Sequence, residues 1–312
     1  MMKDSNPLQF DNIMALESHL EDRINTPLYM ILKANLVTFI IQVLGMSFDE
    51  ETILKVASIL DTNTFDVRLP DASTRLRAIY VTASMMNHSC KPNTRHVIID
   101  NDHNFAVIAT VPISKGEMIT TTYTQTLWGT LDRRQHLRSN KCFDSVKCFW
   151  GNKALSEELR KLKKDNPLQF EDFITKYSQT LHPNNHLVVQ AKLALVQIYG
   201  NCKGCTLSEL PDELLKRKID LCNELLELAD ILEPGWSRFR GTLLLDLQAA
   251  MTVQTKRDFE ADKITKGDAQ GQLMESMTLL QEAANILKVE PDMRLQIENK
   301  IKNLARQLED AD

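Results

Sequence analysis

The alternation of apolar and polar residues indicates a small antiparallel sheet in the first half of the chain. Two runs rich in β-branched and apolar residues, 95–99 and 105–110, flank the polar turn Asp100-Asn101-Asp102-His103-Asn104. Short strands joined by a turn rich in Asn and Asp are typical of a β-hairpin. We therefore predict a hairpin over these residues.

A polar loop precedes the predicted sheet in the sequence, and an aromatic residue ends its last strand. The loop is Asn87-His88-Ser89-Cys90, and Gly116 lies in a turn that leads to a third predicted strand, which ends at Tyr123. Polar groups in a packed loop need hydrogen-bond partners. One interpretation is local capping by Asn and Ser, with His88 and Cys90 buried and satisfied; the other is a functional site.

The rest of the chain has the periodicity of amphipathic helices. Apolar residues recur every three or four positions in 27–46 and 49–60, and Asp49 begins an acidic first turn that favours the helix dipole. The same spacing continues after residue 150, and Pro234-Gly235 is typical of a helix end. The helices predicted there are 154–164, 170–181, 186–199, 212–232, 237–253, 274–288 and 293–308.

These elements predict an α+β protein. A chain of 312 residues suggests two domains, and we place the boundary between a mixed domain, 1–150, and an all-α domain, 151–312. Successive antiparallel helices joined by short turns indicate an array of helical hairpins of the tetratricopeptide (TPR) type. The 34-residue repeat is not clean, so a plain helical bundle is the alternative.

Composition and charge argue against nucleic acid and membranes as direct binding partners. The net charge of -5 argues against direct nucleic-acid binding through bulk electrostatics. Residues 1–12 have no apolar signal core, and the apolar run 36–46 is shorter than the roughly 20 residues that span a bilayer. Six cysteines without a signal indicate reduced thiols. We expect a protein of the nucleus and cytoplasm that does not bind membranes.

A longer joint pattern surrounds the polar loop. The motif Asn-His-Ser-Cys-x-Pro-Asn at 87–93 is followed by Lys115-Gly116-Glu117 and by Tyr123. This pattern resembles the C-terminal half of the SET domain of protein-lysine methyltransferases, specifically the SMYD (SET and MYND) family and its arthropod-type members. Further segments that resemble the family are 16–19, 59–65 and 130–137.

The resemblance implies a partial SET β-fold. It places a helical insert at 20–62, the C-terminal half of the SET domain at 63–125, and a degenerate post-SET segment at 126–150. Proteins of this family begin with a Gly-rich segment that approaches S-adenosylmethionine and continue with a MYND zinc module. The first eighteen residues contain no Gly-x-Gly and no Cys or His ligand. We therefore expect a chain that lacks the MYND module and the N-terminal half of the SET domain.

Methyl transfer from a sulfonium to a lysine amine mainly requires alignment of a neutral amine and oxygen atoms that face the partly positive methyl group. A phenol at a strand end suits this task, so we predict Tyr123 as the catalytic residue. For Phe143, core packing is an alternative to stacking on the cofactor. The residues that the resemblance assigns to S-adenosylmethionine are Asn87, His88, Asn63, Phe143, Glu17 and His19.

This chain departs from the family's pattern of zinc ligands after the SET domain. The family combines the cysteine of the Asn-His-Ser-Cys motif with three cysteines that follow the phenylalanine. In this chain those three positions hold Ser145, Lys147 and Trp150. Cys90 and Cys148 are the only remnants, and two thiolates cannot complete a closed tetrahedral site. We therefore expect no zinc. An alternative site would combine Cys202 and Cys205 with Cys142 or Cys148.

Lys141 is a second departure from the family. Two residues before the phenylalanine, relatives carry an aromatic residue that completes the channel for the substrate lysine. A lysine at this position would bring a positive charge close to the incoming substrate amine, which is unfavourable unless one of them is neutral. The alternative is that Lys141 turns outward and leaves a wider channel.

Two functions from different classes follow. The first is a protein-lysine N-methyltransferase that uses S-adenosylmethionine and acts on a lysine of a histone or non-histone protein. The second is a catalytically degenerate SET scaffold or transcriptional co-repressor. In the second case the helical C-terminal domain would bind protein partners from chromatin or the chaperone machinery.

Overall fold

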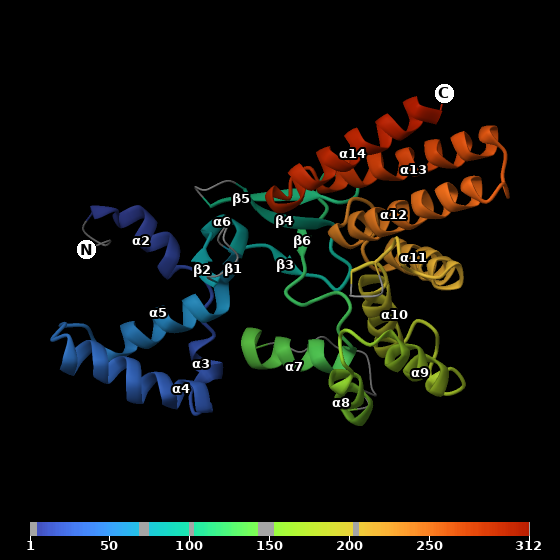
Figure 1. The fold of residues 1–312 in the computed structure, drawn as a ribbon. Helices are drawn as coiled ribbons and strands as arrows, with labels where there is room; N and C mark the ends of the chain where they lie inside the picture. Colours follow the sequence, from blue (N-terminus) through green and yellow to red (C-terminus); the bar gives the residue numbers. More distant parts are fainter. Residues whose placement is uncertain (1–4, 69–74, 100–102, 143–152, 202–205, 312) are drawn as a thin grey trace.

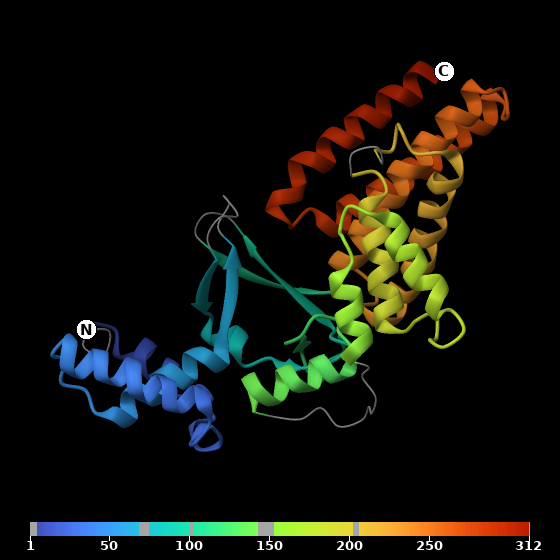
Figure 2. The same cartoon turned by 60° about the horizontal axis from the view of Figure 1, so that its bottom comes forward.

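A computed structural model describes residues 5–68, 75–99, 103–142, 153–201 and 206–311 (Figure 1). The strands occupy the middle of the molecule, between N-terminal helices on one side and a long helical array on the other (Figure 2). This arrangement is consistent with the predicted α+β class. In the described part of the chain, no helix is long and apolar enough to span a membrane.

The N-terminal helices form a small unit with its own apolar cluster. Val37 is buried against Ile53 and Leu54. The helices before α5 are α2 (Pro7–Met14), α3 (Leu20–Arg23) and α4 (Pro27–Ile31). The chain then continues through π-helical segments η1 (Leu32–Val37) and η2 (Phe39–Val43), and then α5 (Glu50–Asn63).

The segment predicted as a helix over 27–46 is helical from Pro27 to Val43, but after α4 its turns are of the π type and not the α type. Apolar spacing of three and four residues signals a helical state but does not distinguish an α turn from the wider π turn. The acidic start of α5 is confirmed: the Asp49 carboxylate accepts a hydrogen bond from the Thr52 backbone N–H at 2.7 Å. This N-cap satisfies one of the free backbone donors of the first turn.

The strands form three two-stranded pairs in the described residues. The predicted hairpin is confirmed, with Thr94 opposite Ala109 and Ile99 opposite Asn104. The third predicted strand pairs in parallel with the polar loop, but it ends at Thr121 and not at Tyr123. The strands are β1 (Thr64–Arg68), β2 (Arg75–Ile79), β3 (Asn87–His88), β4 (Thr94–Ile99), β5 (Asn104–Ala109) and β6 (Thr120–Thr121), and the short helix α6 (Val81–Ser84) lies between β2 and β3.

After β6 the named regular elements of the described chain are all helices. The helix α7 (Thr130–Lys141) begins near α8 and runs below the strands toward the N-terminal helices (Figure 1), where it contacts α5. The array consists of α8 (Lys153–Lys161), α9 (Pro167–Tyr177), α10 (His186–Ile198), α11 (Asp212–Leu232), α12 (Arg238–Glu260), α13 (Lys266–Leu287) and α14 (Pro291–Ala311). Each of α11, α12 and α13 packs on the helix that follows it. The TPR-type repeat and the domain boundary at 150 stay predictions.

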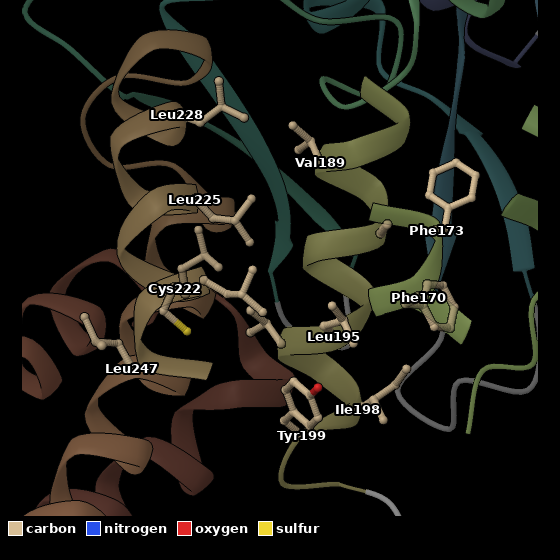
Figure 3. Close-up of a cluster of buried hydrophobic side chains, with 14 of the residues drawn as sticks. Phe170, Phe173, Val189, Leu195, Ile198, Tyr199, Cys222, Leu225, Leu228 and Leu247 are labelled. Carbon is tan, nitrogen blue, oxygen red and sulfur yellow. The ribbon is translucent and has the colours of Figure 1, made fainter. Parts of the chain in front are cut away.

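The largest apolar core lies inside this array (Figure 3). Leu195 of α10 and Tyr199, which directly follows this helix, pack in one core with Phe170 and Phe173 of α9 and the apolar face of α11. Leu195 is fully buried and Tyr199 is 2% exposed. Burial of large side chains to this degree contributes about 2 kcal/mol each, so the core holds the array together.

The array is attached to the β4–β5 hairpin by polar contacts. The Arg95 guanidinium of β4 forms an ion pair with Glu290 at 2.9 Å, and both side chains are nearly buried. The Trp236 backbone N–H donates to the Thr110 carbonyl at 3.1 Å. These contacts fix the hairpin, and the polar loop that precedes it, against the helical array.

Candidate functional site

The site is built where β3 and β6 pair. Their register places His88 opposite Thr121, so that Tyr123 follows β6 on the side of the polar loop. The Tyr123 backbone N–H donates to Nδ1 of His88 at 3.0 Å, and the two ring centroids are 5.3 Å apart. The structure therefore brings the predicted catalytic tyrosine and one predicted cofactor residue into direct contact.

Tyr123 is a half-buried, neutral phenol. Its hydroxyl donates a hydrogen bond to the Met86 carbonyl, one residue before the polar loop. Burial raises the pKa of Tyr123 above its ordinary value, so the hydroxyl keeps its proton near neutral pH. The side chain can therefore present an oxygen dipole and an aromatic wall, but not a phenolate base.

His88 is a neutral imidazole. Because Nδ1 accepts a hydrogen bond from the Tyr123 backbone, the proton of the neutral ring belongs on Nε2, which lies 3.5 Å from the Cys90 sulfur. Burial, and secondarily the Arg133 guanidinium, lower the pKa of His88. The ring therefore works as a hydrogen-bonding and packing group near neutral pH.

We expect acid to destabilise the fold through His88. In the unfolded chain this residue titrates near its ordinary pKa of 6.5, whereas the folded chain takes up the proton only at lower pH. The free energy of unfolding should therefore fall as the pH decreases below about 6.5, until the lowered pKa is passed. The measurement is urea unfolding between about pH 7.5 and about pH 5. His88→Gln should reduce the loss, and an unchanged loss in this variant would contradict the assignment to His88.

Asn87 presents a carboxamide at the surface of this site. The residue is exposed, and its Nδ2 donates to the Met118 sulfur at 3.2 Å. A thioether is a weak acceptor, so the amide can exchange this contact for a stronger one with a ligand. The exposed position of Asn87 is compatible with a cofactor contact, and this role stays a prediction.

Asn63 is not placed as the sequence suggested. It is the last residue of α5, whereas the family motif implied a strand position. Its Nδ2 donates to the Glu17 carbonyl and to the Ile59 carbonyl, both at 2.8 Å. The side chain is nearly buried, because Asn63 ends the helix by bonding back to the preceding turn. Its amide nitrogen is thus used to hold the segment around Glu17 on α5.

Glu17 and His19 lie side by side in the segment before α3. The Glu17 carboxylate accepts a hydrogen bond from the His19 backbone N–H at 2.8 Å, which lowers the pKa of Glu17. Glu17 is exposed, and His19 has a left-handed backbone with φ of 51°. The Glu17 carbonyl accepts a hydrogen bond from the Asn63 amide, and the cofactor roles of Glu17 and His19 stay predictions.

Lys141 points into the site. Its ammonium donates to the Thr62 carbonyl and lies 5.3 Å from the centroid of the Tyr123 ring. Burial lowers the pKa of Lys141. The alternative that this side chain turns outward is therefore wrong: the last turn of α7 faces α5, and the ammonium finds a carbonyl and an aromatic face there.

Arg23 is a residue of this region that the sequence did not single out. It is 4% exposed and donates to Asp61 at 2.7 Å, to the Thr62 hydroxyl at 3.1 Å and to the Asn140 carbonyl at 3.2 Å. These bonds join α3, α5 and the end of α7. The partners are far apart in the sequence, so no local pattern indicated this arginine.

Several predicted residues fall outside the described part of the chain. These are Phe143, Cys148, Cys202 and Cys205. Their predicted roles in stacking and in metal binding stay predictions. Cys90, the motif cysteine, is exposed and contacts the His88 ring, as described above.

Comparison with known proteins identifies the segment that carries this geometry. Residues 14–124 match the SET domain. The chain is 37% identical over 102 residues to the SET domain-containing protein SmydA-8, isoform A, of Drosophila melanogaster, covering 31% of this chain and 22% of that protein. It is 33% identical over 125 residues to the N-lysine methyltransferase SMYD2-B of Danio rerio, covering 39% and 28%. A SET and MYND domain-containing protein of Dictyostelium discoideum is 31% identical over 105 residues, covering 31% and 30%.

These matches cover less than a third of each relative's length. The polar loop, β3 to β6 and Tyr123 all lie within the matched SET segment, 14–124. The names of the matched proteins agree with the resemblance seen in the Asn-His-Ser-Cys motif. Residues 14–124 therefore form a SET domain, and this segment is similar to proteins of the SMYD type.

Proposed function

We propose that the protein transfers a methyl group from S-adenosylmethionine to the side-chain amine of a lysine in a protein substrate. The observation that carries this proposal is the contact between Tyr123 and His88, with the exposed Asn87 carboxamide beside it. It rests also on a relative named as an N-lysine methyltransferase.

The described residues suit the chemistry of this cofactor. S-adenosylmethionine carries a positive sulfonium, and the pair Asn87 and His88 offers neutral polar groups that do not repel it. The exposed Glu17 carboxylate offers an acceptor for hydroxyl or ammonium groups. These three residues, together with His19, would hold the cofactor, which supplies an electrophilic methyl group when bound.

The chain's own contribution is to position the amine and to shape the charge around it. The Tyr123 ring forms a wall, and its hydroxyl and the Met86 carbonyl place two oxygen atoms next to each other. Oxygen dipoles fixed beside a developing positive charge stabilise the transition state more than mobile water does. His88 holds the Tyr123 backbone in place, because its Nδ1 accepts the Tyr123 N–H.

The substrate is proposed as a lysine-containing segment of a histone or another protein, in the nucleus or cytoplasm. Such a segment could be held by the helical array. A cleft of about 1170 Å³ lies between α7 and α8 to α10, with Trp128, His136, Arg160 and Phe170 among its lining residues. Its mixture of aromatic, basic and polar groups suits a peptide, including one from a chromatin or chaperone partner.

A second function, that of a scaffold without catalysis, is favoured by one observation. The Lys141 ammonium lies over the Tyr123 ring and binds the Thr62 carbonyl. An ammonium there would hinder the approach of a second amine to the same ring, by volume and by charge. In that case the helical array would still bind protein partners, and the SET site would have no methyltransferase activity.

Calorimetric titration with S-adenosylmethionine separates the two functions. For the enzyme we expect binding in about the micromolar range, weakened at least about tenfold in Asn87→Ala and in His88→Ala. His182→Ala is a matched control, because His182 also accepts a backbone N–H on Nδ1, from Asn184, but in an exposed turn. If the folded chain does not bind S-adenosylmethionine, the methyltransferase function is contradicted and the scaffold function remains.

A further inference from the structure

We propose that His19, Asp22 and Cys142 form a binding site for a divalent metal ion of the zinc type. Their ligand atoms all lie within 4.8 Å of one another, although they come from segments more than a hundred residues apart in the sequence. The set combines one imidazole, one carboxylate and one thiol. Such a mixture of nitrogen, oxygen and sulfur ligands suits Zn²⁺ and does not suit Mg²⁺ or Ca²⁺.

The distances are close to those of a tetrahedral zinc site. Nδ1 of His19 lies 3.5 Å from Oδ2 of Asp22. Bond lengths of about 2.0 to 2.3 Å to zinc place neighbouring ligand atoms roughly 3.3 to 3.8 Å apart. The first pair already has this spacing, and the Cys142 sulfur lies within 4.8 Å of both other ligand atoms.

The backbone at both ends of the site is unusual. His19 is the N-cap residue before α3 with φ of 51°, and Cys142 is the C-cap residue after α7 with φ of 55°, so both are left-handed residues other than glycine. Such conformations cost about 1 kcal/mol or more and persist only where the surroundings fix them. Arg23 provides one such restraint, since it links α3 to the Asn140 carbonyl at the end of α7. The two halves of the site are thereby held together without a metal.

The charges around the thiol also favour a cation. The Glu17 carboxylate lies 3.8 Å from Nδ1 of His19, on the same ring atom that faces Asp22. The neighbouring Arg23 guanidinium is paired with Asp61 at 2.7 Å, which offsets its positive charge beside the site. The carboxylates of Asp22 and Glu17 therefore favour a divalent cation here.

The site is also accessible. A cavity of about 630 Å³ is lined by Asp22, Cys142 and neighbouring residues of α3, α4 and α7. Three protein ligands leave the fourth position of a tetrahedral ion open, and water from this cavity can fill it. The site shares no residue with the post-SET cysteine pattern, since it uses neither Cys90 nor Cys148. It does not depend on the proposed methyl transfer.

Cobalt titration of the full 312-residue chain tests the proposal without S-adenosylmethionine, because His19 is also a predicted cofactor contact. Co²⁺ bound to a thiolate gives a charge-transfer absorption in the near ultraviolet. We expect one ion per chain, displaced by Zn²⁺, and a rise in melting temperature on metal binding. Cys142→Ser should abolish the charge-transfer band, and His19→Gln should weaken binding at least about tenfold.

Matched thiol controls decide between this site and others. Cys90→Ser, Cys148→Ser and the double replacement of Cys202 and Cys205 by serine should all keep the band. Loss of the band in any of these variants with retention in Cys142→Ser would overturn the proposal, as would absence of Co²⁺ binding by folded chain. Melting temperatures of the metal-free variants show that each is folded.

Discussion

Replacing Gly235 by alanine is expected to lower the free energy of unfolding by about 3 kcal/mol. Two costs combine at this position. Gly235 has φ of +80°, a conformation that residues with a side chain rarely adopt. In addition, a Cβ atom would lie 1.9 Å from the Thr110 carbonyl oxygen, far inside van der Waals contact. Because this oxygen is a backbone atom, it cannot move aside as the end of a flexible side chain would.

Gly116→Ala is the matched control for this variant. Gly116 has a similar φ of +86°, but a Cβ atom there meets nothing within 4 Å. Its replacement should therefore cost only the strain of the left-handed backbone, about 1 kcal/mol. Urea unfolding of both variants measures the difference. Equal losses would show that the contact at Thr110 contributes nothing.

The expected loss in Gly235→Ala has a structural consequence as well. The next residue, Trp236, donates its backbone N–H to the same Thr110 carbonyl, directly after β5. A displaced Gly235 would break this bond and loosen the array from the hairpin. The sequence predicted a helix end at Pro234-Gly235, and α11 does end at Leu232. It could not predict that this turn packs on the hairpin.

Other features of the molecule also differ in whether a short segment or the packing of distant segments determines them. The β4–β5 hairpin and the helices of the array follow from spacing of apolar residues and from turns, which act over a few residues. The contact of His88 with Tyr123 was implied by a motif, and the structure places the two rings together. These features depend on short segments whose sequences specify them.

The features that the sequence missed depend on packing between segments. Asn63 reads as a strand residue beside Phe65, yet it ends α5, because its amide bonds to the Ile59 carbonyl one turn earlier. For Lys141 the sequence leaves two positions open, beside the lysine channel or turned outward, and only the packing of α7 against α5 directs the ammonium to Thr62. No periodicity encodes such pairings, since each needs the position of a second element.

Replacing Tyr123 by phenylalanine is expected to reduce methyl transfer at least about a hundredfold, on the function proposed for the chain. The ring and its contact with His88 remain, whereas the hydroxyl oxygen beside the Met86 carbonyl is lost. The affinity for S-adenosylmethionine should change by less than about threefold, because the phenol contributes mainly in the transition state. Transfer of labelled methyl groups to lysine-containing protein measures the rate, and calorimetry measures the affinity.

Tyr80→Phe is the control that separates chemistry from stability. The Tyr80 hydroxyl also donates to a backbone carbonyl, that of His103, at 2.7 Å, and burial raises the pKa of this phenol too. Both variants leave one carbonyl without its donor, so each should lose about 1 kcal/mol of unfolding free energy. Only Tyr123→Phe should lose methyl transfer, since Tyr80 lies away from His88 and packs on Phe65 and Phe105. Equal rates in the two variants would mean that the Tyr123 hydroxyl serves the fold and not the reaction.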